Sequence, residues 1–139
     1  MTTSPIDGTW SYRALHNDPD LDVAFGDLRF ATAAMTLREE AGRVSGRVVG
    51  EGWGTWTEWS LDLAGQFFGG YPSQLRLRGT NTIDGEPWIY DYRAFLMPHW
   101  PHGDGIREVL VGSVIRSNAR ASHQAVAGLY ASLYAVKRD

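Results

Sequence analysis

The sequence predicts an all-β fold, specifically an eight-stranded antiparallel up-and-down β-barrel with an interior ligand cavity. Composition favours it, because 16 Gly, 6 Trp, 6 Tyr and 5 Phe combine turn-forming residues with large rings that suit a twisted sheet. Apolar and polar residues alternate in eight segments, and short connections rich in Gly, Asp, Asn and Pro separate them. Strands joined in this way close readily into a barrel. A closed barrel has no exposed edge, and its interior has room for one small ligand.

The eight predicted strands are spread over nearly the whole chain. In order they are residues 8–16, 28–39, 43–50, 59–67, 73–83, 86–97, 108–117 and 126–137. A helix is the alternative for 28–39 and 126–137, since both are rich in Ala and Leu. Strands are favoured because the first segment lacks a helix N-cap and ends at a Gly turn, while the second contains an internal Gly and tyrosines that alternation explains.

One hairpin is predicted residue by residue around Asp84-Gly85. This dipeptide lies between two alternating runs, and a type I′ turn needs positive φ at both central residues. Pairing the residues that flank the turn sets the register and places Gly79 opposite Tyr90, where the missing side chain leaves room for a ring. The face predicted to be interior collects Leu75, Leu77, Gly79, Asn81, Trp88, Tyr90, Tyr92 and Ala94.

Composition and charge exclude several kinds of function. Cysteine is absent, which removes thiolate catalysis, thiolate zinc sites and disulfides. The net charge is -3 and the 13 Lys and Arg are scattered, so nucleic acid is not an expected partner. We expect no cofactor.

The chain length and its first residues predict the size and location of the protein. With 139 residues, one domain over 1–139 is the simplest organisation. The opening MTTSPIDGTW lacks the basic and apolar blocks of a signal peptide, and no apolar run approaches the roughly 18 residues of a membrane span. We therefore expect a soluble, cytoplasmic protein that does not enter a membrane.

The start of the first strand carries the motif Gly8-Thr9-Trp10. It resembles the Gly-x-Trp that begins lipocalins and avidins, the calycin-type barrels. In those families the tryptophan closes the barrel floor under a basic residue from a late strand. The resemblance implies that Trp10 does the same here, with Lys137 or Arg138 as its cover. The Thr-Asp-Tyr type turn of lipocalins is missing, so the resemblance concerns architecture and not function.

The barrel end opposite the floor is the predicted ligand mouth. If the strands meander, this end carries the loops 17–27, 51–58 and 118–125 together with the Asp84-Gly85 turn. Tryptophans recur at 53, 56 and 59, in the 51–58 loop and at the start of the strand after it, so one or two of them are expected to lean over the opening.

Alternation from Trp10 directs further side chains to the interior just below this mouth. Together with the tryptophan loop they predict a site for a small apolar or aromatic molecule. The residues predicted to bind it are Tyr12, His16, Trp53, Trp56, Asn81, Trp88 and Tyr90.

The stretch MPHWPHGDG, residues 97–105, raises the alternative of a metal site. His99 and His102 are three residues apart, with Asp104 as the local third ligand. In a loop this spacing does not force two imidazoles to converge, and the stretch falls at the far end from the mouth. We therefore favour a stiff corner in which Trp100 plugs the floor or makes an oligomer contact, and predict no metal.

Two other functions compete with ligand binding. One is a cofactor-independent cyclase, isomerase or lyase in the same pocket, in which His16 or Tyr90 works with a rim carboxylate. The candidate carboxylates are Asp18, Glu51 and Glu58.

The other is an interaction module with a sealed barrel. Its aromatic far end would mediate assembly, for example into a homo-oligomer. The residues of that end are Phe67, Phe68, Tyr71 and Trp100.

Overall fold

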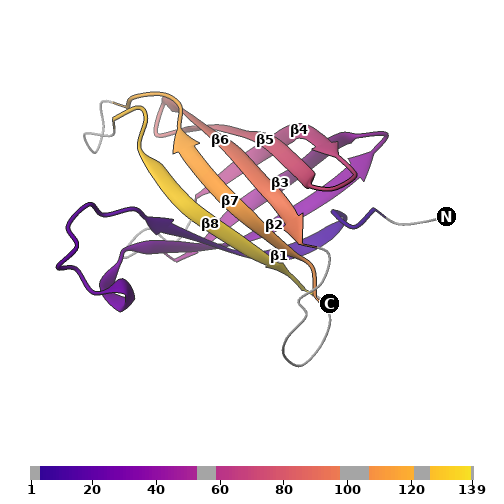
Figure 1. Cartoon of the computed structure of the whole chain (residues 1–139). Helices are drawn as coiled ribbons and strands as arrows, with labels where there is room; N and C mark the ends of the chain where they lie inside the picture. Colours follow the sequence, from indigo (N-terminus) through magenta and orange to yellow (C-terminus); the bar gives the residue numbers. More distant parts are fainter. Residues whose placement is uncertain (1–3, 53–58, 98–106, 121–125, 139) are drawn as a thin grey trace.

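Eight antiparallel strands form one closed barrel in the computed structural model, which describes residues 4–52, 59–97, 107–120 and 126–138 (Figure 1). Each strand pairs with the next along the chain, and the last pairs with the first. This confirms the predicted barrel and strand order. The bounds are β1 Gly8–His16, β2 Phe30–Glu40, β3 Arg43–Gly52, β4 Ser60–Phe68, β5 Ser73–Ile83, β6 Glu86–Met97, β7 Val109–Arg116 and β8 Tyr130–Lys137, with a 3-10 turn η1 Phe25–Asp27 before β2.

The two Ala-rich segments are strands, as predicted, but both begin later than expected. Strand β2 starts at Phe30, because η1 occupies the residues before it and the Leu28 amide still bonds back to the Phe25 carbonyl. Strand β8 starts at Tyr130, because Gly128 adopts φ 86° in a turn. Among the described residues, no helix is both long and apolar enough to cross a bilayer.

The β5–β6 hairpin has the predicted register throughout, from Ile83 paired with Glu86 onward. Asp84 and Gly85 have φ values of 52° and 77°, as a type I′ turn requires. The space at Gly79 is shared by side chains other than the one directly opposite. A Cβ on Gly79 would lie 3.1 Å from Cδ2 of Leu63, 3.2 Å from Cδ1 of Leu61 and 3.2 Å from Cε2 of Tyr92, the diagonal neighbour. The strands are twisted, which brings this diagonal neighbour over the glycine.

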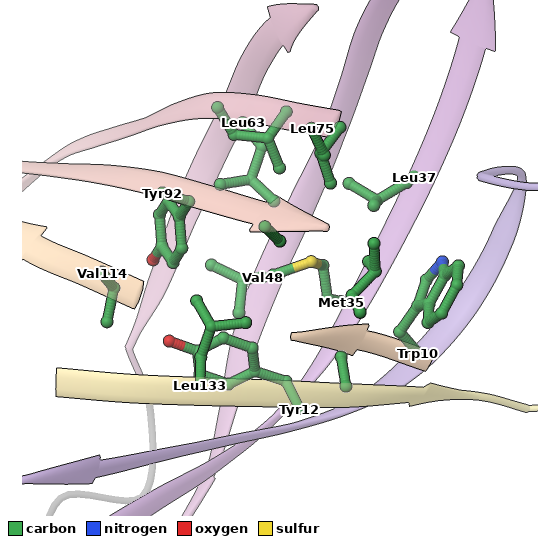
Figure 2. Packing of buried hydrophobic residues seen from close by; sticks show 14 of the residues in the cluster. Trp10, Tyr12, Met35, Leu37, Val48, Leu63, Leu75, Tyr92, Val114 and Leu133 are labelled. Atoms are coloured by element: carbon green, nitrogen blue, oxygen red, sulfur yellow. The ribbon is translucent and has the colours of Figure 1, made fainter. Parts of the chain in front are cut away.

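The barrel interior is an apolar core with no buried charged residue among those described. Side chains of every second residue point inward, as the period of two requires. Figure 2 shows Trp10 at one end of this cluster, and the hydroxyls of Tyr12 and Tyr92 point away from Trp10. The buried apolar side chains include Tyr12 and Ala14 of β1, Met35 and Leu37 of β2, Val48 of β3, Leu61 and Leu63 of β4, Leu75 and Leu77 of β5, Tyr92 of β6, Leu110 and Val114 of β7 and Leu133 of β8.

Trp10 closes the floor of the barrel. Its ring is fully buried and its Nε1 donates to the Ile6 carbonyl at 3.0 Å. Lys137 covers it, with Nζ 5.6 Å from the ring centroid and donating to the Pro5 carbonyl at 2.9 Å. Of the two basic residues that the resemblance offered, Lys137 is therefore the cover, because Arg138 bonds to polar side chains on the outer surface.

Candidate ligand-binding site

A cavity of about 500 Å³ occupies the barrel on the side away from Trp10. It lies toward the end that carries the 17–29 connection, whereas the start of β1 and the end of β8 lie at the opposite end (Figure 1). The lining residues come from β1, β2, β4, β6, β7, β8 and the connections beside them. They are Tyr12, Ala14, His16, Arg29, Ala31, Trp59, Leu61, Trp88, Tyr90, Tyr92, Val114, Arg116, Arg120, Leu129, Tyr130 and Ala131.

Four of the predicted site residues line this cavity together: Tyr12, His16, Trp88 and Tyr90. Asn81 is not among the lining residues. Its side-chain amide donates to the Ser60 carbonyl at 2.7 Å, and its side-chain oxygen accepts from the Thr82 amide. These local bonds hold Asn81 to the wall between β4 and β5. Trp53 and Trp56 lie outside the described residues.

The third tryptophan of the expected mouth, Trp59, does line the cavity. Its indole lies directly across Gly50 of β3, where any Cβ would collide with the ring. The Gly50 amide also donates to the Trp59 carbonyl at 2.8 Å. A glycine on the inner face of β3 thus makes room for an aromatic wall.

The deep end of the cavity is formed by two tyrosines. Tyr12 and Tyr92 are both buried and meet edge to face, with ring centroids 6.2 Å apart and planes at 70°. Burial raises the pKa of both hydroxyls well above the usual range, with smaller contributions from neighbouring tyrosines. Both are therefore neutral at ordinary pH and act as hydrogen-bonding groups in an apolar wall.

The opposite end of the cavity is polar and centres on the Tyr90 hydroxyl. That oxygen accepts a hydrogen bond from Nε of Arg116 at 3.2 Å and another from Nη2 of Arg120 at 3.0 Å. The guanidinium of Arg120 also lies over the Trp88 ring, 3.7 Å from its centroid. The indole of Trp88 is in turn 6.4 Å from the Tyr90 ring.

Backbone docking explains how Arg120 reaches this place from a loop. After β7 the chain continues beside β6, where the Ser117 amide donates to the Ile89 carbonyl at 2.9 Å. The Asn118 side chain then clamps the two segments. Its oxygen accepts from the Ile89 amide at 3.1 Å and its nitrogen donates to the Pro87 carbonyl at 2.8 Å.

His16 lies at the end of β1, next to two of the arginines. Its backbone amide donates to the Arg29 carbonyl at 2.8 Å, which extends the β1–β2 ladder and brings Arg29 to the cavity. Burial, and then the charges of Arg116 and Arg29, lower the pKa of the imidazole. His16 is therefore a neutral ring at neutral pH.

No Asp or Glu is among the described residues that line the cavity. Of the rim carboxylates considered for acid/base chemistry, Glu51 pairs with Arg138 at 2.7 Å on the outer surface. Asp18 is exposed and accepts from the Asp20 amide at 2.9 Å. Glu58 lies outside the described residues.

The residues of the alternative metal site, His99, His102 and Asp104, also lie outside the described residues, together with Trp100. Within the parts of the chain that the structure describes, no three His, Cys, Asp or Glu side chains gather in a way that would hold a metal ion.

No family model, curated protein or solved structure matches this chain. The structural class of the protein therefore rests on its fold and cavity alone. It is a closed eight-stranded up-and-down barrel with an aromatic-lined cavity at one end. This architecture is compatible with the calycin-type barrels that Gly8-Thr9-Trp10 resembles.

The three arginines are the charged lining residues that the sequence did not predict. Arg29 and Arg116 carry a usable signal, because each continues the inward period of its strand, from Ala31 and Val114 respectively. Arg120 follows β7 in a loop and carries no such signal. Its position depends on the contacts of Asn118, which no local pattern predicts.

Proposed function

We propose that this protein binds a small, largely apolar molecule with an aromatic or unsaturated body inside the barrel. The observation that supports it most is the cavity of about 500 Å³ walled by Tyr12, Trp59, Trp88 and Tyr92. Ligand sites typically measure about 300–1,000 Å³ and combine apolar and aromatic walls with a few placed polar groups. A guest here would contact rings on several sides and find charged groups at one end only.

Two observations weigh against the competing functions. An interaction module with a sealed barrel requires a filled interior, whereas the described residues leave a cavity of about 500 Å³ at the end away from Trp10. Phe68 and Tyr71, two of the aromatic residues of such a module, are exposed, but nothing in the described structure identifies a partner for them. An acid/base enzyme requires a proton-transfer pair in the cavity, and the described lining residues offer no carboxylate to work with His16 or Tyr90.

The test is titration with N-phenyl-1-naphthylamine, an uncharged aromatic probe whose fluorescence rises in an apolar site. We expect saturable binding to one site per chain, with micromolar affinity. A pocket-filling variant, Ala131→Trp, places an indole in the cavity, since Ala131 lines it from β8. We expect this variant to bind the probe at least about tenfold more weakly. The new indole would occupy the space in which the probe contacts the aromatic walls, so the probe would bury much less apolar surface.

A matched control separates cavity binding from surface binding. Thr80→Trp adds the same ring to the exposed outer face of β5 and is expected to bind the probe as the wild type does. Circular dichroism would establish that both variants fold. Binding that is unsaturable, or equal in Ala131→Trp and the wild type, would contradict the proposed function.

A further inference from the structure

We infer that the ligand is an organic acid, whose oxyanion group binds between Arg116, Arg120 and the Tyr90 hydroxyl while its apolar body fills the cavity below. This inference rests on the proposed function and specifies the chemical class of the ligand. A carboxylate and a phosphate monoester share the chemistry concerned, a planar or tetrahedral set of anionic oxygens that guanidinium groups recognise.

Charge at the cavity is the first argument. Three arginines line it, Arg29, Arg116 and Arg120, with no Asp or Glu among the described lining residues. One carboxylate, that of Glu86, acts on the charge of Arg120, and Glu86 is not among the lining residues. Burial outweighs its effect, so the pKa of Arg120 lies below the usual value. Positive charge thus gathers at one end of an apolar cavity, where an anion would offset it.

Hydrogen bonding is the second argument, because Arg116, Arg120 and the Tyr90 hydroxyl act as donors toward a ligand. The Tyr90 oxygen already accepts from Arg116 and from Arg120, so its own O–H hydrogen is what it can offer a ligand. Arginine has five N–H donors and no acceptor. A ligand group that only accepts hydrogen bonds, such as a carboxylate, matches this set; an ammonium or an alkyl group does not.

The buried nitrogen of Arg120 is the third argument. Its Nη1 is removed from solvent and has no hydrogen-bond partner among the described residues. Its Nη2 bonds to Tyr90, and the guanidinium lies over the Trp88 ring. A guanidinium held on two sides keeps its orientation, and a buried donor without a partner is unfavourable until an acceptor reaches it. The oxyanion would supply that acceptor.

The test uses four probes with the same naphthalene body and different head groups. They are 1-naphthoate, 1-naphthyl phosphate, 1-naphthylmethanol and 1-naphthylmethylamine. Affinities would be measured by calorimetry, or by displacement of N-phenyl-1-naphthylamine. We expect the better of the two anions to bind at least about tenfold more tightly than the alcohol, as a charge-assisted hydrogen bond allows, and the amine to bind most weakly. Whether the carboxylate or the phosphate binds more tightly identifies the source of the oxyanion.

Two variants assign the preference to named groups. In Arg120→Gln and in Arg116→Gln, the ratio of anion to alcohol affinity is expected to fall to about threefold or less, since one charged donor is lost from each. The control is Arg93→Gln, which removes an arginine exposed on the outer face of β6 and should retain the wild-type ratio. Two separate variants and the wild-type series keep the test decisive if one variant fails to fold.

The outcomes separate this inference from the proposed function. If the neutral probe binds in the cavity but the alcohol or amine equals the anions, the inference is wrong and the proposed function stands. An anion preference that persists in both variants would also overturn it. If neither the neutral probe nor any naphthalene compound binds, the proposed function fails and this inference fails with it.

Discussion

The guanidinium of Arg120 lies over Trp88, with Cζ 3.7 Å from the ring centroid, and bonds to the Tyr90 hydroxyl through Nη2. This contact joins the connection after β7 to the inner face of β6. It also determines which groups a guest meets at the open end of the cavity. Trp88 therefore has two roles: it forms part of the apolar wall of the cavity, and it orients the positive charge of Arg120.

Replacement of Trp88 is expected to weaken binding through both effects. Trp88→Leu removes an aromatic wall and the stacking surface of Arg120, so affinity for N-phenyl-1-naphthylamine should fall about 5- to 50-fold. Fluorescence titration measures it. The matched control, Phe95→Leu, changes a ring exposed on the outer face of the same strand and should leave the affinity unaltered. Equal losses in the two variants would exclude Trp88 from the site.

The floor is expected to contribute strongly to stability. Trp10 is fully buried, so Trp10→Ala should cost about 3–5 kcal/mol in the free energy of unfolding, by lost burial and the cavity left behind. Lys137→Met keeps an aliphatic chain over the ring and removes the charge and its hydrogen bond to the Pro5 carbonyl, and should cost about 1 kcal/mol. Urea unfolding gives both values. A Lys137→Met variant as unstable as Trp10→Ala would show that the ammonium, and not the ring, holds the floor.

Gly112 is expected to tolerate no side chain. A Cβ at this position of β7 would overlap the Arg93 carbonyl and lie 2.7 Å from Cα of Ala94, both in the neighbouring strand. Because backbone cannot move aside as a flexible side chain does, Gly112→Ala should destabilise the fold by at least about 2 kcal/mol. Gly69→Ala is the control, since a Cβ there meets nothing within 4 Å, and should change stability by about 0.5 kcal/mol or less. Urea unfolding of the pair tests the prediction, and similar stabilities would contradict it.

The pH dependence of stability should carry a contribution from His16. Its pKa in the folded protein is lowered from the ordinary 6.5 by burial first and then by Arg116 and Arg29, so the unfolded chain binds the proton more readily. The contribution is fully present above the unfolded pKa. It is lost as the pH falls from there to the folded pKa.

The variant His16→Gln isolates this effect. Between about pH 7.5 and about pH 5, the wild type should lose more unfolding free energy than the variant does. Titration of the His16 imidazole by NMR provides the direct check. A folded-state pKa at or above 6.5 would contradict the prediction.

Local patterns predicted the barrel well. The Asp84-Gly85 turn fixes the register of the β5–β6 hairpin, because a two-residue turn with positive φ at both residues pairs the residues that flank it. Once the register is fixed, the alternation of apolar and polar residues determines which side chains face inward. The Ala-rich segment at β2 formed a strand because its alternate residues, Ala33, Met35 and Leu37, are needed to fill the interior.

The candidate site was predicted only in part, for physical reasons. Tyr12, Trp88 and Tyr90 follow from alternation along strands, so sequence reasoning found them. Asn81 shares the inward parity, but nearby backbone groups satisfy its amide and hold it to the wall. Arg120 depends on long-range docking of a loop against β6, for which the sequence offers no periodic signal.

The most direct test of ligand binding within the barrel is to locate a bound probe by NMR. In a complex with 1-naphthoate, we expect intermolecular NOEs from the naphthalene protons to the methyl groups of Leu61, Val114 and Ala131, which line the cavity from three strands. The signals of the Arg120 guanidinium should shift on binding. NOEs only to outer-face side chains such as Phe68 or Phe95, or no saturable complex with either 1-naphthoate or N-phenyl-1-naphthylamine, would contradict a binding function for this cavity.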